Sequence, residues 1–184
     1  MTRGEASDAQ LLQQALRGAE AAFDQLYRRH RTPIFRFAWR LTGSVAVAED
    51  ITQECFLALL GGARFEEGQG KLRTYLFGIA RHYAWKHLRQ DEREVDGAEA
   101  DDVAGGAPDA LSGLLSRERS ALVERAVMAL PPLQREALIL FEYEDLALEE
   151  IAAITGIDAG AVKSRLHRAR QTLRRSLACE RSCP

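Results

Sequence analysis

The sequence contains few of the residues that stabilise small secreted or β-rich proteins. Its three cysteines, Cys55, Cys179 and Cys183, are an odd number and do not form a disulfide framework. Prolines number only five and aromatic residues make up 7% of the chain. Alanine, leucine, arginine and glutamate are abundant instead, and these residues favour helix. The composition therefore predicts an all-α protein from a reducing compartment.

Long hydrophobic runs are also missing. No apolar stretch approaches the roughly 20 residues that a membrane-spanning helix needs. The first residues, MTRGEASDAQLLQQALRG, lack the apolar core of a signal peptide. We therefore expect a cytoplasmic protein without membrane insertion.

Catalytic and metal-binding patterns are absent from the sequence as well. The four histidines are dispersed, and there is no HExxH, P-loop or GxSxG motif. Cys179 and Cys183 could bind a metal or form a redox pair, although a frayed tail with two incidental thiols is the simpler interpretation. We expect no enzymatic activity, no cofactor and no metal.

The middle of the chain differs from both of its flanks. Residues 91–109, DEREVDGAEADDVAGGAPD, contain eight acids and one base. Such a segment buries too little apolar surface to offset the entropy lost on ordering. We therefore predict two small helical domains, 1–90 and 115–178, joined by a flexible acidic linker at 91–114 and followed by a tail at 179–184.

Hydrophobic periodicity and helix breakers predict the helices of the first domain. Gly18 separates a first helix from a second, and Pro33 is suited to begin a third helix that ends at Gly43. A further helix covers about 45–60 and stops at Gly61-Gly62. After the loop RFEEGQG, the last helix of this domain covers about 71–90.

The second domain ends in a pattern typical of a helix-turn-helix. In LEEIAAITGIDAGAVKSRLHRAR, Gly156 supplies a left-handed turn residue, Ile157 fills the corner and Asp158 caps the next helix. At about 100° per residue, the apolar side chains of that helix share one face. They are Val162, Leu166, Ala169, Leu173 and Leu177.

The opposite face of the same helix is polar and basic. Residues 156–177 contain six Lys or Arg in a chain whose formal net charge is -2. Cations gathered on one face suit a phosphate backbone, and polar side chains among them can reach base edges. The face comprises Lys163, Ser164, His167, Arg168 and Gln171. A solvated basic helix, or an amphipathic helix on a membrane surface, is the alternative interpretation.

Three stretches of the chain resemble known sequences. AEDITQECFLALL (48–60) followed by GKLRTYLFGIARHYAWKHLRQ (70–90) resembles region two of bacterial sigma factors, and 129–177 resembles region four. The order, the short length and the acidic linker resemble the extracytoplasmic-function group, group four of the sigma-70 family. The resemblance implies a transcription initiation factor whose partners are core RNA polymerase, promoter DNA and an anti-sigma factor.

The resemblance also implies roles for single residues. The polymerase-docking positions of the family match Asp50, Gln53, Glu54 and Leu57. Their i, i+3, i+4, i+7 spacing places all four on one helix face, opposite Ile51, Cys55 and Leu59.

The helix at 71–90 matches the element that reads and opens the minus-ten sequence. The residues expected to contact DNA there are Lys71, Arg73, Arg81, His82, Tyr83, Trp85 and Lys86. Cations would follow the backbone and an aromatic ring would stack on an extruded base. For Tyr83 and Trp85, burial in the core is the alternative. His82 stands where the family has Asn, which leaves the minus-ten preference open, and residues 65–71 match the family's specificity loop.

In region four, Lys163, Ser164, His167 and Arg168 match the positions that read the minus-thirty-five element, while Arg165 and Arg170 are expected to serve phosphates or the fold. Ala147 stands where the family often has a capping Ser or Thr. Without a capping Ser or Thr, the helix that follows loses about 1 kcal/mol of stability unless Asp145 caps it instead.

Two other classes of protein fit part of the sequence. An autonomous helix-turn-helix regulator would bind an operator as a dimer without polymerase. An anti-sigma-like interaction protein would have no use for the basic face. Binding to duplex DNA without polymerase, and a dimer interface, would distinguish the first of these.

Overall fold

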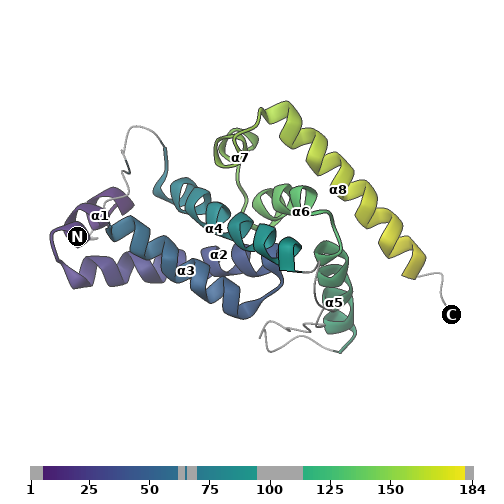
Figure 1. Ribbon diagram of the computed structural model, residues 1–184, viewed down its shortest axis with the longest axis horizontal. Helices are drawn as coiled ribbons and strands as arrows, with labels where there is room; N and C mark the ends of the chain where they lie inside the picture. The colour runs from purple at the N-terminus through teal and green to yellow at the C-terminus, as the bar shows by residue number, and fades with distance from the viewer. Residues whose placement is uncertain (1–5, 62–64, 66–69, 95–113, 181–184) are drawn as a thin grey trace, which may run out of the picture.

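In the computed structural model, residues 6–61, 65, 70–94 and 114–180 are described, and all regular secondary structure in those ranges is helical. The elements are α1 (Asp8–Leu16), α2 (Glu20–Thr42), α3 (Val45–Leu60), α4 (Leu72–Glu94), α5 (Leu114–Met128), α6 (Pro132–Leu138), a π-helical turn η2 (Ile139–Tyr143), α7 (Leu148–Thr155) and α8 (Ala159–Glu180). The expected all-α class is confirmed. Figure 1 shows α1–α4 as one bundle and α5–α8 as a second group beside α4.

Local sequence signals set several helix ends. Ser7 and Gln10 form a capping box at α1, in which Ser7 Oγ accepts the Gln10 N–H at 3.2 Å and Gln10 Oε1 accepts the Ser7 N–H at 3.1 Å. Gly43 ends α2 in the left-handed region, at φ 81°. Helix α3 begins and ends where the sequence predicts, with the Ser44 side chain accepting the Val47 N–H at 3.3 Å.

The prediction that Pro33 begins a new helix is wrong. Helix α2 runs without interruption from Glu20 to Thr42 and contains Pro33 in its interior. Proline removes a backbone donor there, which normally disfavours helix. Tertiary packing outweighs that cost, because one apolar stripe continues past Pro33 on both sides. The buried side chains of this stripe are Ala22, Leu26, His30, Ile34, Phe37, Ala38 and Leu41.

Helix α3 buries one face against the bundle. Ile51 and Cys55 are fully buried and Leu59 is 1% exposed. Burial raises the pKa of the Cys55 thiol to about 12, with a smaller contribution from the Glu54 charge. At neutral pH the thiol is therefore protonated and behaves as a small apolar side chain.

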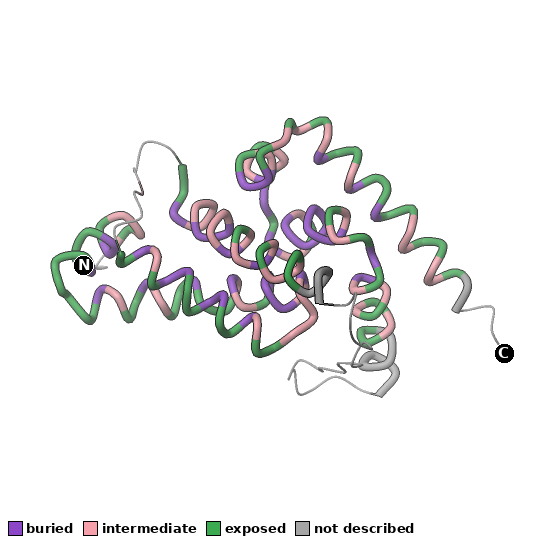
Figure 2. The backbone as a smooth tube through the Cα atoms, in the orientation of Figure 1, coloured by how far each residue is buried: buried purple, intermediate pink, exposed green. Residues whose placement is uncertain are grey.

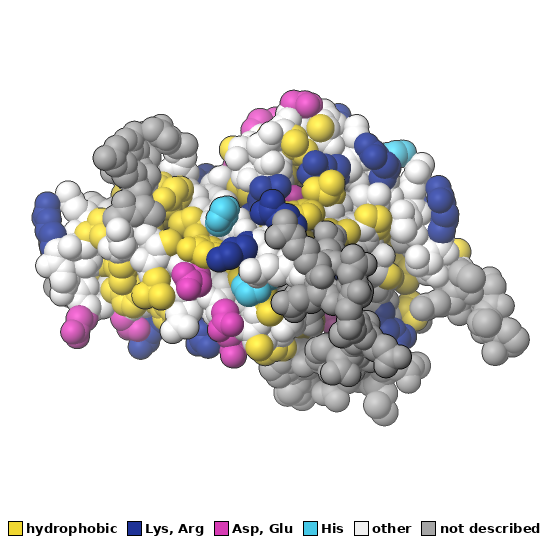
Figure 3. All heavy atoms as spheres, in the orientation of Figure 1, with side chains coloured by type: hydrophobic (Ala, Val, Ile, Leu, Met, Phe, Trp, Pro, Cys, Tyr) yellow, Lys and Arg dark blue, Asp and Glu magenta, His cyan; other side chains and the backbone are white. Residues whose placement is uncertain are grey.

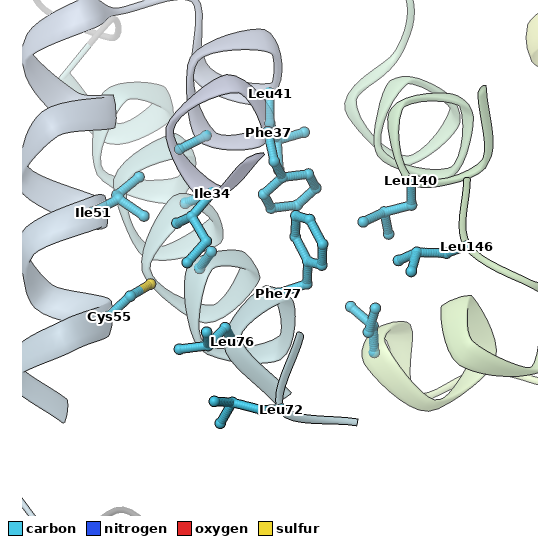
Figure 4. Packing of buried hydrophobic residues seen from close by; sticks show 14 of the residues in the cluster. Ile34, Phe37, Leu41, Ile51, Cys55, Leu72, Leu76, Phe77, Leu140 and Leu146 are labelled. Atoms are coloured by element: carbon cyan, nitrogen blue, oxygen red, sulfur yellow. The ribbon is translucent and has the colours of Figure 1, made fainter. Parts of the chain in front are cut away.

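The two helical groups share one hydrophobic core. Phe37 of α2 and Phe77 of α4 meet edge to face at 5.4 Å between ring centroids, and Leu140 and Leu146 of the C-terminal group point toward them (Figure 4). Figure 2 shows buried segments continuing from α2 and α4 into η2 and α7. The sequence does not predict this junction.

A second, smaller core lies within the C-terminal group. It joins α5, α6 and α8 through Val127, Leu130, Leu138 and Ala169. Helix α5 also reaches the first bundle, because a Cβ atom added at Gly43 would lie only 2.9 Å from Met128 Cε. The linker expected at 91–114 lies mostly outside the described residues, and α4 extends to Glu94.

Candidate nucleic-acid and protein interfaces

The first candidate surface is the outer face of α3. Asp50, Gln53, Glu54 and Leu57 are all exposed, and Leu57 is 58% exposed. They stand opposite the buried face of the helix, as the spacing predicts. Figure 3 shows acidic side chains gathered over this helix. An exposed leucine flanked by two carboxylates and an amide suits a basic protein partner with an apolar contact point.

The second candidate surface lies on α8, and its corner is built as the sequence predicts. Gly156 adopts φ 70° at the end of α7. Asp158 Oδ1 accepts the Ala161 N–H at 2.9 Å and so caps α8. A Cβ atom at Gly160 would lie 2.9 Å from that carboxylate oxygen, so the residue beside the cap has to be small.

The two faces of α8 separate cleanly. Val162, Leu166 and Ala169 are buried, and Leu173 and Leu177 are half-buried. All the predicted DNA-facing side chains are exposed, namely Lys163, Ser164, His167, Arg168 and Gln171. The first four of these line a shallow hollow together with Gly160, and Figure 3 shows basic side chains along this edge.

Two arginines of α8 are held by the C-terminal group itself. Arg170 Nη2 lies 2.6 Å from Glu142 Oε1, and its guanidinium lies over the Phe141 ring. Arg165 Nη1 lies 3.7 Å from Glu136 Oε2. Both therefore have contacts within the fold in this structure.

The third candidate surface, at α4, is partly covered by the C-terminal group: Arg73, Arg81 and Trp85 are half-buried, whereas Lys71 is exposed. Arg73 Nη2 donates to the Glu144 carbonyl oxygen at 2.7 Å and to Glu144 Oε2 at 3.1 Å. Lys71 Nζ lies 3.1 Å from Glu150 Oε1. Arg81 Nε lies 2.8 Å from Glu136 Oε1. Three of the predicted DNA-binding cations thus pair with acids of the C-terminal group.

Trp85 also contacts Glu136, the acid that lies beside Arg81. Its indole Nε1–H donates to Glu136 Oε1 at 2.5 Å, and the Arg81 guanidinium lies 5.9 Å from the centre of its ring. The Glu136 side chain is fully buried. Burial raises the pKa of Glu136, opposed by the Trp85 hydrogen bond and by the charge of Arg81.

The remaining predicted residues of α4 lie differently. His82 and Lys86 are exposed. The His82 and Tyr83 rings meet edge to face at 5.5 Å. Tyr83 is half-buried beside Glu54 of α3, and burial together with that carboxylate raises the pKa of Tyr83. The specificity loop expected at 65–71 lies mostly outside the described residues.

Sequence reasoning missed the acids that face α4. Glu136 and Glu144 are buried, at 0% and 4% exposed. Burial raises the pKa of Glu144, and the Arg73 contact opposes this. The sequence does indicate that Glu136 needs a buried partner, because this acid lies on the apolar face of REALIL. Nothing in the sequence identifies that partner as Arg81 or Trp85.

Glu150 fills the place of the missing cap on α7. The Ala147 N–H donates to Glu150 Oε2 at 3.0 Å. This hydrogen bond is the main cause of a lowered Glu150 pKa, with Lys71 and Thr74 adding to it. Asp145 instead adopts a left-handed conformation at φ 51°. Half of a capping box therefore replaces the serine or threonine cap.

In the part of the chain that the structure describes, no group of three or more His, Cys, Asp or Glu side chains could hold a metal ion. Within the same residues, no helix is long and apolar enough to cross a membrane. Of the two tail cysteines named as a possible metal or redox pair, the side chain of Cys179 and the whole of Cys183 lie outside what the structure describes.

Comparison with known proteins links this chain to a family. Residues 26–94 match the model of sigma-70 region 2, and residues 120–173 match that of sigma-70 region 4. The ECF RNA polymerase sigma factor SigM of Mycobacterium tuberculosis is 34% identical over 176 residues, covering 95% of this chain and 87% of that protein.

SigE of Mycolicibacterium smegmatis, another ECF RNA polymerase sigma factor, is 32% identical over 167 residues, and the match spans 63% of its length. Among solved structures, the sigma factor RpoE from Bartonella quintana, in complex with the anti-sigma factor NepR, superposes with a TM-score of 0.71 at 31% identity. That match covers 85% of this chain and 96% of the other.

Proposed function

This chain belongs to the extracytoplasmic-function group of the sigma-70 family. From that premise we propose which partner each of its three candidate surfaces binds during transcription initiation. The α3 face binds core RNA polymerase, the α4 face binds the minus-ten DNA, and the exposed face of α8 reads the minus-thirty-five element. The protein carries no chemistry of its own. It positions the polymerase and helps to separate the strands.

One observation supports this division above the others. The chain is close to neutral overall, yet α3 exposes Asp50 and Glu54 while α8 exposes Lys163 and Arg168. Surfaces of opposite sign suit different partners and steer each partner to its own site. Acids on α3 would repel DNA, so that face suits a protein.

The α8 face has the chemistry of a duplex reader. Lys163 and Arg168 can neutralise phosphates and release counterions. Ser164, His167 and Arg168 can donate to base edges in the major groove. The buried Val162, Leu166 and Ala169 fix the helix from behind, so the exposed side chains are presented by a rigid element.

We also propose control by an anti-sigma factor. The Bartonella quintana relative was solved in complex with one. A partner that covers the α3 or α8 face would block polymerase or promoter, and the exposed Leu57 gives such a partner an apolar anchor.

Transcription in vitro tests the proposal. Purified chain and core RNA polymerase are incubated with a library of genomic fragments, and the 5′ ends of the transcripts are sequenced. We expect initiation at a set of sites that share two spaced elements and that core enzyme alone does not use. Folded protein that binds core enzyme nowhere and directs no initiation would contradict it.

The alternative, an autonomous operator-binding regulator, predicts a different result. Such a protein would bind specific duplex fragments without polymerase and would be a dimer. We expect the free chain instead to bind fragments weakly, because two small DNA contacts gain avidity only when polymerase fixes their spacing. Selection of fragments with and without core enzyme distinguishes the two functions.

A further inference from the structure

We propose that the DNA-binding face of α8 continues past Gln171, and that Arg174 and Arg175 bind phosphates of the duplex beside the minus-thirty-five element. The inference rests on the proposed function of α8 as the reader of that element. It adds a contact that holds the duplex without reading its bases. Both arginines follow residue 173, where the match to the region 4 model ends, so the family resemblance assigns them no role.

The basic residues of α8 fall into two sets. Arg165 and Arg170 contact carboxylates within the C-terminal group. Among the residues that the structure describes, no carboxylate pairs with the other four cations, and all four are exposed. They are Lys163, Arg168, Arg174 and Arg175. The sequence has no acid between Asp158 and Glu180 that could neutralise this set.

Helical geometry places Arg174 and Arg175 on the exposed face already described. At about 100° per residue, Arg174 lies about 20° and Arg175 about 120° around the helix from Lys163. By the same spacing Arg168, at the far edge of that face, lies about 140° from Lys163. Both arginines therefore lie within the arc that Lys163 and Arg168 bound. Figure 3 shows Lys and Arg side chains spaced along this edge of the molecule.

Apolar packing supports the part of α8 that carries these two arginines. Leu173 packs against the smaller core between α5, α6 and α8, and Leu177 on the same side is half-buried. Figure 1 shows α8 as one continuous helix that runs past α6. A helix held from behind therefore presents Arg174 and Arg175 to solvent.

The length of α8 determines what the two arginines can reach. Arg174 follows Lys163 by eleven residues, which is about 17 Å along the helix axis. The major groove is only about 12 Å wide. When the first turns of α8 contact bases in the groove, its later turns therefore lie over the phosphate backbone at the edge of the groove.

Arginine has the chemistry that this position needs. A guanidinium donates charge-assisted hydrogen bonds to phosphate oxygens, often two at a time. Each phosphate that is neutralised releases counterions and adds about 0.9 to the salt dependence of binding, whatever the base sequence. Arg174 and Arg175 therefore strengthen binding to any duplex, while the choice of sequence rests on side chains nearer the start of the helix.

Duplex binding by the free, full-length chain tests the inference. The probes are two fluorescent duplexes of about 30 base pairs at about 25 mM salt, one with the minus-thirty-five element of a promoter selected by transcription and one with its sequence shuffled. Arg174→Gln with Arg175→Gln should weaken binding to both by the same factor, about tenfold or more. That difference should shrink by about tenfold at about 100 mM salt, because about two fewer phosphates are neutralised.

Two control variants separate a phosphate contact from other causes. Arg28→Gln with Arg125→Gln removes the same charge from exposed positions on α2 and α5, and should leave affinity and salt dependence nearly unchanged. Arg174→Lys with Arg175→Lys keeps both charges and should retain most of the salt dependence, because a lysine ammonium also pairs with phosphate. Circular dichroism of each chain checks that the helices persist.

Neutral backbone linkages locate the contact on the duplex. Methylphosphonates are placed one at a time along the promoter duplex. They should weaken binding of the unchanged chain at one or two positions just outside the bases whose choice depends on Arg168. The same linkages should have no effect on the variant with Arg174→Gln and Arg175→Gln.

Three results would overturn the inference: a loss confined to the promoter duplex, an unchanged salt dependence, or equal affinities for the glutamine pair and the unchanged chain. These outcomes are separate from the test of the proposed function. If the chain directs initiation at no promoter, the proposed function fails, and the shuffled duplex still decides whether Arg174 and Arg175 bind phosphate. If it directs initiation but the glutamine pair binds normally, the inference alone fails.

Discussion

His30 is the residue whose environment gives the clearest pH dependence. It is 5% exposed, and its Nε2 lies 2.8 Å from Asp8 Oδ2, which joins α1 to α2. Burial lowers the pKa of His30 from the ordinary 6.5, with Arg29 and Arg73 contributing, and Asp8 opposes the shift. The folded protein therefore keeps the imidazole neutral at pH values where the unfolded chain binds a proton.

We predict that this residue makes the protein less stable in mild acid. The stabilisation is present above the ordinary pKa and is lost as pH falls from about 7 through the lowered pKa, by at most about 1.4 kcal/mol per pH unit. Urea unfolding at pH 7.5 and 5.5 measures it, with His30→Gln as the comparison. The unchanged chain should lose more unfolding free energy than the variant, and equal losses would show that His30 plays no part.

Glu136 and Glu144 change the stability with pH in the opposite direction to His30, because burial raises the pKa of both carboxyl groups. A raised carboxyl pKa favours the protonated form in the folded state, so its contribution is present in acid and is lost as pH rises. Both acids are retained in the His30→Gln variant. Their contributions therefore cancel when the two chains are compared.

Helix α7 depends on a cap that comes from within its own first turn. Glu150→Ala removes the acceptor of the Ala147 N–H, and we predict a loss of about 1 kcal/mol in unfolding free energy. Its contact with the highly exposed Lys71 adds little, because solvent screens such pairs. Thermal unfolding near neutral pH measures the loss.

Glu149→Ala is the matched control for that variant, since Glu149 is an exposed acid in the same turn. We expect a change below about 0.5 kcal/mol for it. The lowered pKa of Glu150 means that its stabilisation is present above the ordinary value of 4.5 and is lost as pH falls below it. The difference between Glu150→Ala and the unchanged chain should therefore shrink in strong acid, and a pH-independent difference would contradict the capping role.

Substitutions on α8 should distinguish a residue that contacts phosphate from a residue that contacts a base. We predict that Lys163→Ala weakens initiation at all selected promoters and lowers the salt dependence by about one counterion. Arg168→Ala should relax the choice of bases in the minus-thirty-five element, at about 1–3 kcal/mol for the preferred sequence. Sequencing of transcripts from the promoter library measures both effects.

Arg125→Ala is the control for these two variants, because Arg125 is an exposed arginine of α5 on the same helical group. It should leave promoter choice unchanged. If Arg168→Ala selects the same promoters as the unchanged chain, α8 does not read bases through this residue.

Single helices could be predicted from the sequence where their own periodicity and caps decide the outcome. Helix α3 has its predicted bounds, and the exposed and buried faces of α8 are those expected from its spacing. Gly156 and Asp158 form the predicted corner. The prediction that a helix begins at Pro33 is wrong because packing of α2 on both sides of Pro33 outweighs the backbone hydrogen bond that proline removes. The hydrophobic spacing near one residue does not reveal that packing.

At the scale of the whole molecule, the junction between the two helical groups could not be predicted. Lys71, Arg73 and Arg81 were expected to meet DNA, and the acids that contact them come from segments about 50 to 80 residues away. Nothing local in α4 distinguishes a cation that awaits phosphate from one paired with a carboxylate. The roles of these residues in DNA binding therefore stay predictions, and in this structure each of them contacts a carboxylate of the C-terminal group.

The measurement that tests the account most directly is the equilibrium affinity of the free, full-length chain for core RNA polymerase. Asp50→Lys with Glu54→Lys reverses two charges on α3, and Glu20→Lys with Asp24→Lys reverses an equally spaced exposed pair on α2. We predict tight binding for the unchanged chain and the α2 pair, and a loss of about tenfold or more for the α3 pair, equivalent to about 1.4 kcal/mol. Equal affinity for all three chains, or no binding by any of them, would contradict the account.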